Sequence, residues 1–295
     1  MDQLHAYSAA KLEPRPDLEK PMNDVSFAAG TVPAQMRYVN TEWKHTDEIP
    51  RIGSRETRRA NTSFHDIRVH DARPGLESGA ITLEQNGFTL SKNPTACPDF
   101  RDEATVQNVY YPEVEKVVRQ VTGADHVFIR SHLIRTETPV DFNDGYARFV
   151  HCDYNIKRLQ EMSEDVLKQH GVEPNPNWDY VWFNTWQPFD NPAVHNPMAF
   201  LDWASLPMDD VIDYFYTGRN YDALVAAPVF NPEHKWQYIP NMQTDEIIVF
   251  KQMDGRGGDR SIYCPHTSFD NKAADPEAPP RRSCETRILA CYERK

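Results

Sequence analysis

The spacing of apolar residues differs between the two parts of the chain, with helical periods before residue 178 and strand-like segments after it. In "DEATVQNVYYPEVEKVVRQVTG" (102–123), valine and tyrosine recur at helical spacing, which predicts an amphipathic helix that is split or kinked at Pro112 and ends at Gly123. "DYNIKRLQEMSEDVLKQHG" (153–171) has the same spacing and predicts a second helix.

Three segments of the first part have strand signals. "FHDIRVHDARP" (64–74) alternates apolar and polar residues, and "DHVFIRSHLIR" (125–135) predicts a strand directly after the first helix. "ITLEQNGFTLSK" (81–92) predicts a hairpin, because Asn86-Gly87 is a strong signal for a two-residue turn.

The second part is rich in strands. Its spacing is typical of an all-β sandwich or barrel. The seven predicted strands are 178–189, 196–206, 223–230, 234–240, 245–254, 260–269 and 281–294. Together with the earlier helices, this pattern predicts a mainly β fold with flanking helices, built on a double-stranded β-helix (jelly-roll, cupin-like) core.

The domain organisation follows from the same pattern. Residues 1–60 have weak periodicity and many polar and proline residues, so we expect an extended N-terminal arm that wraps the body or a second subunit. Residues 61–295 contain no linker that demands a further division, and we expect a single jelly-roll domain with helical support. The arm is compatible with a homodimer.

Composition and charge restrict the partners. The net charge of −12 disfavours nucleic acid, which requires a concentrated basic surface. No apolar run is long enough to cross a membrane, and the first twenty residues lack an apolar signal core. The five cysteines show no CxxC spacing, so we expect a reducing, cytoplasmic setting. Aromatic residues make up 11% of the chain, which suits either a core or a deep apolar pocket.

The stretch "RFVHCDYN" (148–155) contains a candidate metal pair. Residues two apart on a strand point to the same side, so His151 and Asp153 project together if this stretch is extended. One imidazole and one carboxylate are two of the three ligands in the two-histidine, one-carboxylate arrangement of non-haem Fe(II) oxygenases. The pair alone has little specificity, because the HxD pattern is common by chance.

A third ligand is expected to be a histidine on a late strand. The histidines after the pair are His170, His195, His234 and His266. His170 lies at a predicted helix end and His195 in a turn, which leaves His234 and His266 as the competitors. The later sequence favours His266, because "RRSCETR" contains an Arg-x-Ser pattern fifteen residues further on.

This Arg-x-Ser strand predicts an anion site inside the barrel. Arg281, Ser283, Glu285 and Arg287 alternate onto one strand face. A buried arginine requires an anionic partner, and its planar fork suits a carboxylate such as the far carboxylate of 2-oxoglutarate. The alternative is that Arg281 and Arg287 pair with Glu285 and nearby acids on the surface.

From about residue 65 onward the chain resembles the AsaB-type hydroxylase/desaturase family, also described as CmcJ/NvfI/EfuI-like. The matching stretches are "DIRVHDARP", "LEQNGFTL", "VYYPEVEKVVRQVTGADHVFI", "RFVHCDYN", "FNTWQPF", "NPMAFLDWASL", "HKWQYIPNMQTDEIIVFKQMD", "PHTSFDN" and "APPRRSCETRILACY". The resemblance implies a jelly-roll oxygenase that uses Fe(II), 2-oxoglutarate and O₂. It implies metal ligation by His151, Asp153 and His266, and 2-oxoglutarate binding by Arg281 with Ser283, with Arg287 in reserve.

The resemblance also implies a substrate class. Members of this family hydroxylate, desaturate or form endoperoxides on hydrophobic natural products, fungal meroterpenoids among them. We therefore expect a small hydrophobic secondary metabolite as the substrate. The residues that we expect to line its pocket are Asn184, Trp186, His132, Arg135, Trp203 and Phe269.

Departures from the family pattern concern the pocket. The chain has Gln187 after "NTW", where the resemblance leads us to expect arginine, and Arg282 where an acidic residue is expected. Arg130 and Ser131 also depart from the pattern of the strand that precedes the HxD pair. These changes leave the expected metal ligands in place and indicate an altered substrate pocket.

Two other functions fit part of this pattern. A cupin-like isomerase or hydrolase would use the same three ligands for Zn(II) or Mn(II) without 2-oxoglutarate. A non-catalytic jelly-roll binding protein would need neither metal nor co-substrate. Oxygen-dependent formation of succinate distinguishes the oxygenase from both.

Overall fold

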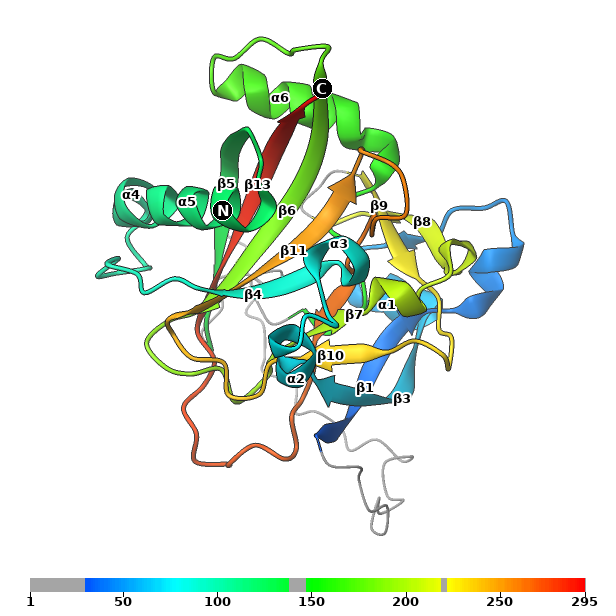
Figure 1. Cartoon of the computed structure of the whole chain (residues 1–295). Coiled ribbons are helices and arrows are strands. Elements are labelled where there is room, and N and C mark those ends of the chain that lie inside the picture. The colour runs from blue at the N-terminus through cyan, green and yellow to red at the C-terminus, as the bar shows by residue number, and fades with distance from the viewer. Residues whose placement is uncertain (1–29, 138–146, 219–221, 295) are drawn as a thin grey trace, which may run out of the picture.

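The computed structural model describes residues 30–137, 147–218 and 222–294. Its largest sheet, here called the main sheet, has five antiparallel strands (Figure 1). In spatial order these are β4 (Phe88–Lys92), β11 (Glu246–Asp254), β6 (Trp178–Pro188), β13 (Ser283–Glu293) and β5 (His126–Arg135).

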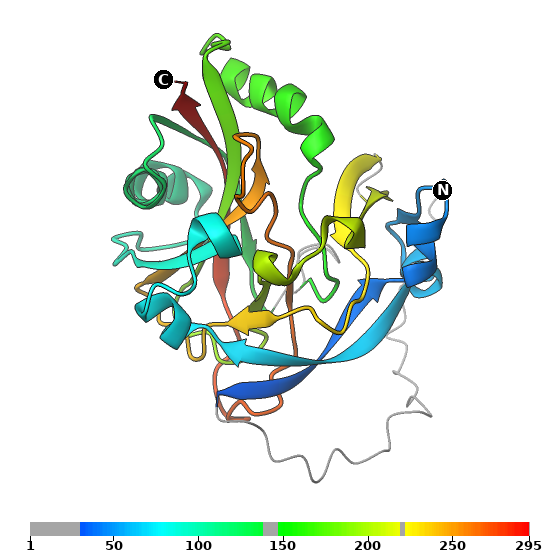
Figure 2. The same cartoon turned by 45° about the vertical axis from the view of Figure 1, so that its right-hand side comes forward.

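A second sheet faces the main sheet across an apolar core (Figure 2). Its strands, in spatial order, are β1 (Thr31–Val39), β3 (Thr62–Asp71), β10 (Trp236–Tyr238), β7 (Met198–Leu201) and β12 (His266–Ser268). Phe200 of this sheet meets Phe250 of the main sheet with ring centroids 5.1 Å apart. Two curled sheets around one core confirm the predicted jelly-roll architecture.

A small third sheet and several short helices complete the described chain. The strands are β2 (Arg51–Ile52), β8 (Val211–Tyr216) and β9 (Ala223–Pro228). The short helical segments are η1 (Thr41–His45), α1 (Arg55–Asn61), α2 (Arg73–Glu77), α3 (Leu83–Asn86), α4 (Glu103–Thr105), η2 (Val106–Tyr110), η4 (Ile156–Arg158), η5 (Trp203–Ser205) and η6 (Met208–Asp210).

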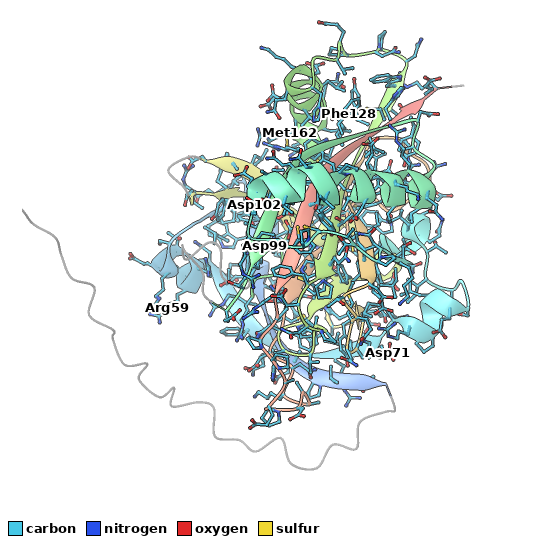
Figure 3. The ribbon with its side chains drawn as sticks, turned by 90° about the vertical axis from the view of Figure 1, so that its left-hand side faces the viewer. Arg59, Asp71, Asp99, Asp102, Phe128 and Met162 are labelled. Carbon is cyan, nitrogen blue, oxygen red and sulfur yellow. The ribbon has the colours of Figure 1, made fainter. Side chains whose placement is uncertain are left out.

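Both predicted amphipathic helices are present and cover different parts of the main sheet. Helix α5 (Tyr111–Thr122) lies across its outer face, where Val114 and Val118 join the cluster that contains Phe183 (Figure 3). Helix α6 (Leu159–Gln169) packs on the opposite face near one end of this sheet and contributes Met162 to the cluster around Trp182 (Figure 1). The apolar stripe of each helix is thereby buried, which is the main source of helix stability in proteins.

The predicted hairpin at 81–92 is wrong. Residues Leu83–Asn86 form helix α3, capped by the Thr82 side chain, and Gly87 ends it with a φ of 92°. A glycine with positive φ serves a helix C-cap as well as a hairpin turn, so the Asn-Gly signal did not distinguish the two. Strand β4 then pairs with β11, far along the chain.

The described part of the predicted arm, residues 30–60, is built into the body of the protein. Strand β1 pairs with β3 over nine residues and is an edge strand of the second sheet. Ala34, Met36 and Tyr38 alternate with more exposed residues along β1 and are buried in the apolar cluster on the face of this sheet that points away from the main sheet. Residues 1–29 of the predicted arm lie outside the described residues. None of the helices in the described ranges could span a membrane.

Candidate active site

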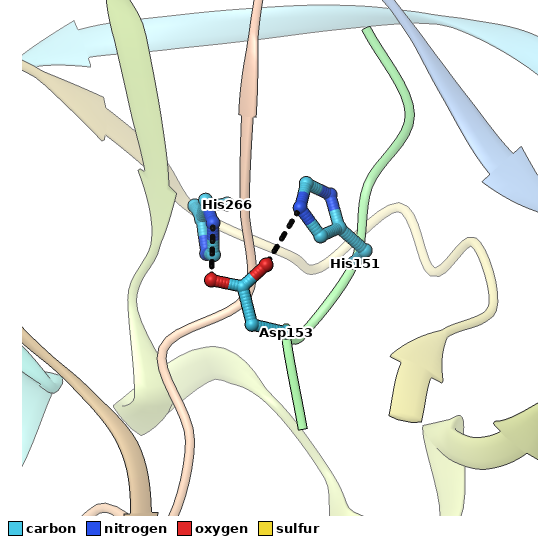
Figure 4. Close-up of side chains that lie close together, drawn as sticks. All are labelled: His151, Asp153 and His266. Atoms are coloured by element: carbon cyan, nitrogen blue, oxygen red, sulfur yellow. Dashed lines mark ion pairs between the residues drawn. The ribbon is translucent and has the colours of Figure 1, made fainter. Parts of the chain in front are cut away.

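The HxD segment lies beside β12 and brings the predicted ligands together (Figure 4). His151 and His266 exchange both backbone hydrogen bonds, with N–O distances of 3.2 and 3.0 Å. Residues paired in this way in an antiparallel bridge project to the same side, and the two imidazole ring centroids are 4.6 Å apart. The carboxylate of Asp153, two residues on, faces both rings.

Three ligand atoms converge in this cluster. The Nε2 atom of His151 is 3.4 Å from Oδ1 of Asp153, and Nε2 of His266 is 4.0 Å from Oδ2. One ligand atom from each residue lies within 4.8 Å of the others, and among the described residues this is the one such group of His, Cys, Asp and Glu. The His266 side chain is buried, whereas His151 and Asp153 remain slightly exposed.

Each imidazole is oriented by a backbone carbonyl. Nδ1 of His151 lies 2.6 Å from the oxygen of Phe149, and Nδ1 of His266 lies 3.1 Å from the oxygen of Cys264. An Nδ1–H donated to a carbonyl leaves the Nε2 lone pair for a metal, which is the usual arrangement of histidine ligands. The donor set therefore fits a divalent metal ion.

The electrostatics favour the protonation states that a metal requires. Burial of Asp153 acts to raise its pKa, but Arg287 and the two histidines outweigh it and hold that pKa well below its usual range. Burial, together with nearby His151, lowers the pKa of His266 to about 3. The cluster thus holds a carboxylate and a neutral imidazole at neutral pH, the forms that bind metal.

Two further side chains contact the HxD segment directly. The amide of Asn184 donates to Oδ2 of Asp153 at 2.5 Å, and the backbone N–H of Asp153 donates to Oε1 of Gln252 at 3.1 Å. Gln252 was not predicted. It lies at a β-bulge between Lys251 and Met253, which breaks the alternation of β11. No local sequence signal marks such a bulge.

Arg281 and Ser283 lie further along the inner face of the main sheet. Arg281 is 1% exposed, its Nη1 donates to the oxygen of Asn196, and its guanidinium carbon is 5.4 Å from the ring of Trp186. The Ser283 hydroxyl and the Trp186 indole N–H are buried and have no hydrogen-bond partner among the described residues. A cation and two donors without partners therefore lie on neighbouring buried parts of the same face, since Ser283 is two residues along β13 from the partner of Trp186.

Arg287 lies at the metal cluster itself. Its Nη2 is 4.0 Å from Oδ1 of Asp153, and its Nε is 3.4 Å from Oε1 of Glu285. The two arginines of the predicted anion site thus have different surroundings. Arg287 is paired with acids beside the metal ligands, and Arg281 stacks on an aromatic ring away from them.

Five of the six predicted pocket residues separate into two groups. Asn184 and Trp186 lie on the inner face of β6, and Arg135 pairs in register with Ser283 on the neighbouring strand. Phe269 belongs to the cluster on the opposite face of the second sheet and contacts Tyr238. Trp203, in η5, packs at the edge of that cluster, so the structure does not bring these two aromatic residues to the metal ligands.

His132 is the clearest correction. A bulge opposite Arg287 and Ile288 inserts one extra residue into β5 and reverses the alternation beyond it. The His132 side chain therefore faces helix α5, where its Nδ1 lies 2.8 Å from the hydroxyl of Tyr111. It does not face the metal cluster.

The competing third ligands lie elsewhere. Nδ1 of His234 is 3.3 Å from the Tyr38 hydroxyl, and its Nε2 is 3.4 Å from Asp210. Nε2 of His170 lies 3.0 Å from the backbone oxygen of Ile129. Neither histidine joins the metal cluster.

Comparisons with known proteins agree with this site. Residues 34–291 match the family model described as an oxidoreductase/YMDC permease-like domain. The hydroxylase/desaturase EfuI of Hormonema carpetanum is 29% identical, with 89% of this chain and 98% of the relative covered. The alpha-ketoglutarate-dependent dioxygenase PhiK of a fungal species is 31% identical, with 79% of this chain and 86% of the relative covered.

The solved structures show the same fold. The iron and alpha-ketoglutarate-dependent endoperoxidase NvfI superposes with a TM-score of 0.75 at 25% identity, covering 90% of this chain and 100% of that structure. These relatives favour the oxygenase over the isomerase, hydrolase and binding-protein alternatives, and they confirm the resemblance found in the sequence. The chain belongs to the oxidoreductase/YMDC permease-like family and, within it, to the AsaB-type oxygenases, oxidoreductases that use Fe(II), 2-oxoglutarate and O₂.

Proposed function

We propose that this enzyme oxidises an unactivated C–H bond of a small, hydrophobic fungal secondary metabolite. In a hydroxylation, one oxygen atom of O₂ enters the product and the other enters succinate, while 2-oxoglutarate loses CO₂. The single observation that carries the proposal is the convergence of His151, Asp153 and His266 at one point, with the buried Arg281 and Ser283 on the inner side of the facing main sheet. The relatives' names, which include hydroxylase/desaturases and an endoperoxidase, support the reaction class.

The three ligands of the cluster would hold iron and leave other coordination positions for co-substrate and O₂. When bound, iron supplies the redox chemistry that activates O₂. The chain's own contribution is geometric and electrostatic. Phe149 and Cys264 fix the imidazoles through their carbonyl groups, and Arg287 keeps the carboxyl of Asp153 ionised.

Arg281, Ser283 and Trp186 would bind the far carboxylate of 2-oxoglutarate. The buried hydroxyl and indole N–H have no other partner among the described residues, and each can donate to a carboxylate. Trp186 lies two residues along β6 from Asn184, a separation of about 7 Å on a strand. That spacing suits a molecule whose far carboxylate is two methylene groups from the keto carbon that binds the metal.

The inner face of the barrel would shield the reaction from water. Phe250 packs against the ring of His266 at 4.9 Å, and Trp186 and Phe200 belong to the same apolar cluster. Such a wall would hold an apolar substrate and exclude solvent from reactive species. Hydroxylation, desaturation and endoperoxide formation differ in the fate of the substrate radical once the hydrogen has been removed, and the position of the substrate in this pocket would decide between them.

The setting of the enzyme is also a proposal. We propose a cytoplasmic protein, because all five cysteines are free thiols and four of them are buried. A homodimer stays a prediction, which the molar mass in solution would test.

The test is addition of Fe(II) and 2-oxoglutarate without oxygen, followed by exposure to O₂. We expect a visible charge-transfer band in the first step and oxygen-dependent succinate in the second. His266→Ala should abolish both, because the metal loses a ligand, whereas the control His170→Ala, at a helix end, should keep both. Metal-dependent conversion of a substrate without O₂ or succinate would instead support the hydrolase or isomerase.

A further inference from the structure

We propose that Asn184 is a positioning residue that keeps Asp153 a one-oxygen ligand of the metal, with Glu285 and Arg287 holding the amide in place. The inference rests on the proposed function, since it concerns how the metal cluster leaves room for the keto-acid end of 2-oxoglutarate. Asn184 itself contacts the metal-binding residue Asp153 and does not contact the reacting atoms.

The two oxygens of Asp153 have different partners. Oδ1 is the nearer to a histidine ligand atom, at 3.4 Å from Nε2 of His151. Oδ2 is 2.5 Å from Nδ2 of Asn184 and 4.0 Å from Nε2 of His266. Oδ1 is therefore the oxygen placed for the metal, while Oδ2 is occupied by a hydrogen bond.

Asn184 is held rigidly. It is fully buried in β6, the central strand of the main sheet, and pairs in register with Phe250 on one side and Arg287 on the other. Its Nδ2 also lies 3.5 Å from Oε1 of Glu285, which in turn accepts from Nε of Arg287 at 3.4 Å. A backbone fixed on both sides and a side chain fixed between two acceptors cannot turn away from Asp153.

The orientation of the amide follows from charge. Both groups that face Nδ2 are carboxylates, which accept hydrogen bonds and do not donate them when ionised. Turning the amide by 180° would place its oxygen against Asp153 and Glu285 and leave both carboxylates without this donor. The N–H groups therefore point at Asp153 and Glu285, because only this orientation gives both carboxylates a donor, and Oδ1 of Asn184 is left without a partner among the described residues.

The chemical consequence concerns the number of free coordination positions. Three protein ligands would leave other coordination positions of a bound metal for the keto acid and O₂. A carboxylate that bound through both oxygens would take one of these positions and compete with the keto acid. The Asn184 hydrogen bond prevents this without adding a charge beside the metal.

The experiment measures binding rather than turnover. Asn184→Leu removes the hydrogen bond at similar size, and Asn184→Ser provides a polar variant whose hydroxyl is too short to reach Asp153. Thr185→Val is the matched control, because Thr185 is equally buried on the same strand but faces the other way. Each Fe(II)-loaded protein is titrated without oxygen with 2-oxoglutarate and with 2-oxopentanoate, which lacks the far carboxylate, and the charge-transfer band is followed.

We expect both Asn184 variants to bind both keto acids about 10- to 100-fold more weakly, the range found for residues that orient metal ligands. Thr185→Val should bind them as the wild type does. If the affinities for the two keto acids fall equally, the variant has disturbed binding of the keto-acid end to the metal. Loss of a contact with the far carboxylate would instead lower the affinity for 2-oxoglutarate alone. Unchanged affinities in metal-loaded Asn184→Leu or Asn184→Ser would overturn the inference, and absence of the band in the wild type would instead overturn the proposed function.

Discussion

Arg281 and Arg287 lie six residues apart in sequence, and their guanidinium groups have different electrostatic surroundings. Arg287 lies beside Asp153 and Glu285, so its charge is already matched by two acids. Arg281 is buried against Trp186, next to a serine hydroxyl with no partner among the described residues. A carboxylate bound at Arg281 would also receive the Ser283 hydroxyl and the Trp186 indole N–H as donors, whereas removing Arg287 would chiefly disturb the metal ligand.

Arg281→Ala should raise the 2-oxoglutarate concentration required for half-maximal turnover by about 10- to 100-fold, because a hydrogen bond to a charged group contributes roughly 1.5–3 kcal/mol. Arg281→Lys should recover part of the loss, since it restores the charge but not the planar fork. Succinate formation at a series of 2-oxoglutarate concentrations gives the measurement.

The matched control for this prediction is Arg282→Ala. Arg282 is the next residue, but its guanidinium pairs with Glu137 and Asp190 near the surface. The Arg282→Ala variant should therefore need the same 2-oxoglutarate concentration for half-maximal turnover as the wild type. A requirement that responds to Arg287→Ala and not to Arg281→Ala would transfer the anchoring role to Arg287.

The candidate site could be predicted from the sequence as far as strand alternation holds. His151 and Asp153 satisfy the i, i+2 rule, and the Arg-x-Ser pattern correctly favoured His266 over His234. At two other places a β-bulge breaks the i, i+2 alternation, and the prediction from sequence was wrong there. One in β5 turned His132 to the outer face, and one in β11 brought the unpredicted Gln252 to the metal cluster. Bulges depend on the partner strand, which a single sequence does not specify.

At the level of elements, long periodic segments were predictable and short ambiguous ones were not. The two amphipathic helices and the strands β5, β6, β11 and β13 lie where the pattern placed them. Strands β1 and β8 were missed, since each becomes buried only through neighbours that are distant in sequence. Propensity is a weak guide for such strands, because their stability comes from cross-strand contacts.

One ion pair joins elements that the sequence does not connect. Arg73 at the start of α2 donates to both oxygens of Glu246 at the start of β11, at 2.9 and 2.8 Å. The backbone N–H of Gln243 donates to the same carboxylate at 2.8 Å. The hydrogen bonds from Arg73 lower the pKa of Glu246 to about 2, despite its burial.

Glu246→Gln should therefore lower the free energy of unfolding at pH 7 by about 1–3 kcal/mol, as a charged hydrogen bond is lost in a buried place. The pKa of Glu246 is lower in the folded state than its ordinary value of 4.5, so its contribution is complete above pH 4.5 and is lost as the pH falls towards 2. Urea unfolding at several pH values should show the difference between wild type and variant shrinking over that interval.

The control is Asp245→Asn, which removes the neighbouring carboxylate. Asp245 pairs with Lys92 in an exposed position, and exposed ion pairs contribute little. A difference between wild type and Glu246→Gln that stayed constant from pH 7 to pH 2 would show that the effect is packing rather than charge.

At the scale of the whole molecule, the metal ligands connect segments that no local structure joins. His151 and Asp153 lie on a segment held to β12 and β9 by isolated bridges, and His266 lies on the edge strand of the second sheet. Asn184 links the same cluster to the main sheet. A metal ion bound there would tie both sheets and the HxD segment together in the folded state alone.

Metal binding should accordingly stabilise the entire fold. A ligand present at 100 times its dissociation constant adds about 2.7 kcal/mol to the free energy of unfolding, provided it does not bind the unfolded chain. Fe(II) under anaerobic conditions should therefore raise the melting temperature by several degrees, a chelator should reverse the rise, and 2-oxoglutarate should add to it only when metal is present. His266→Ala should lose the increase while keeping a cooperative transition. If the metal raised the melting temperature of that variant as much as that of the wild type, the stabilising ion would be bound outside this cluster.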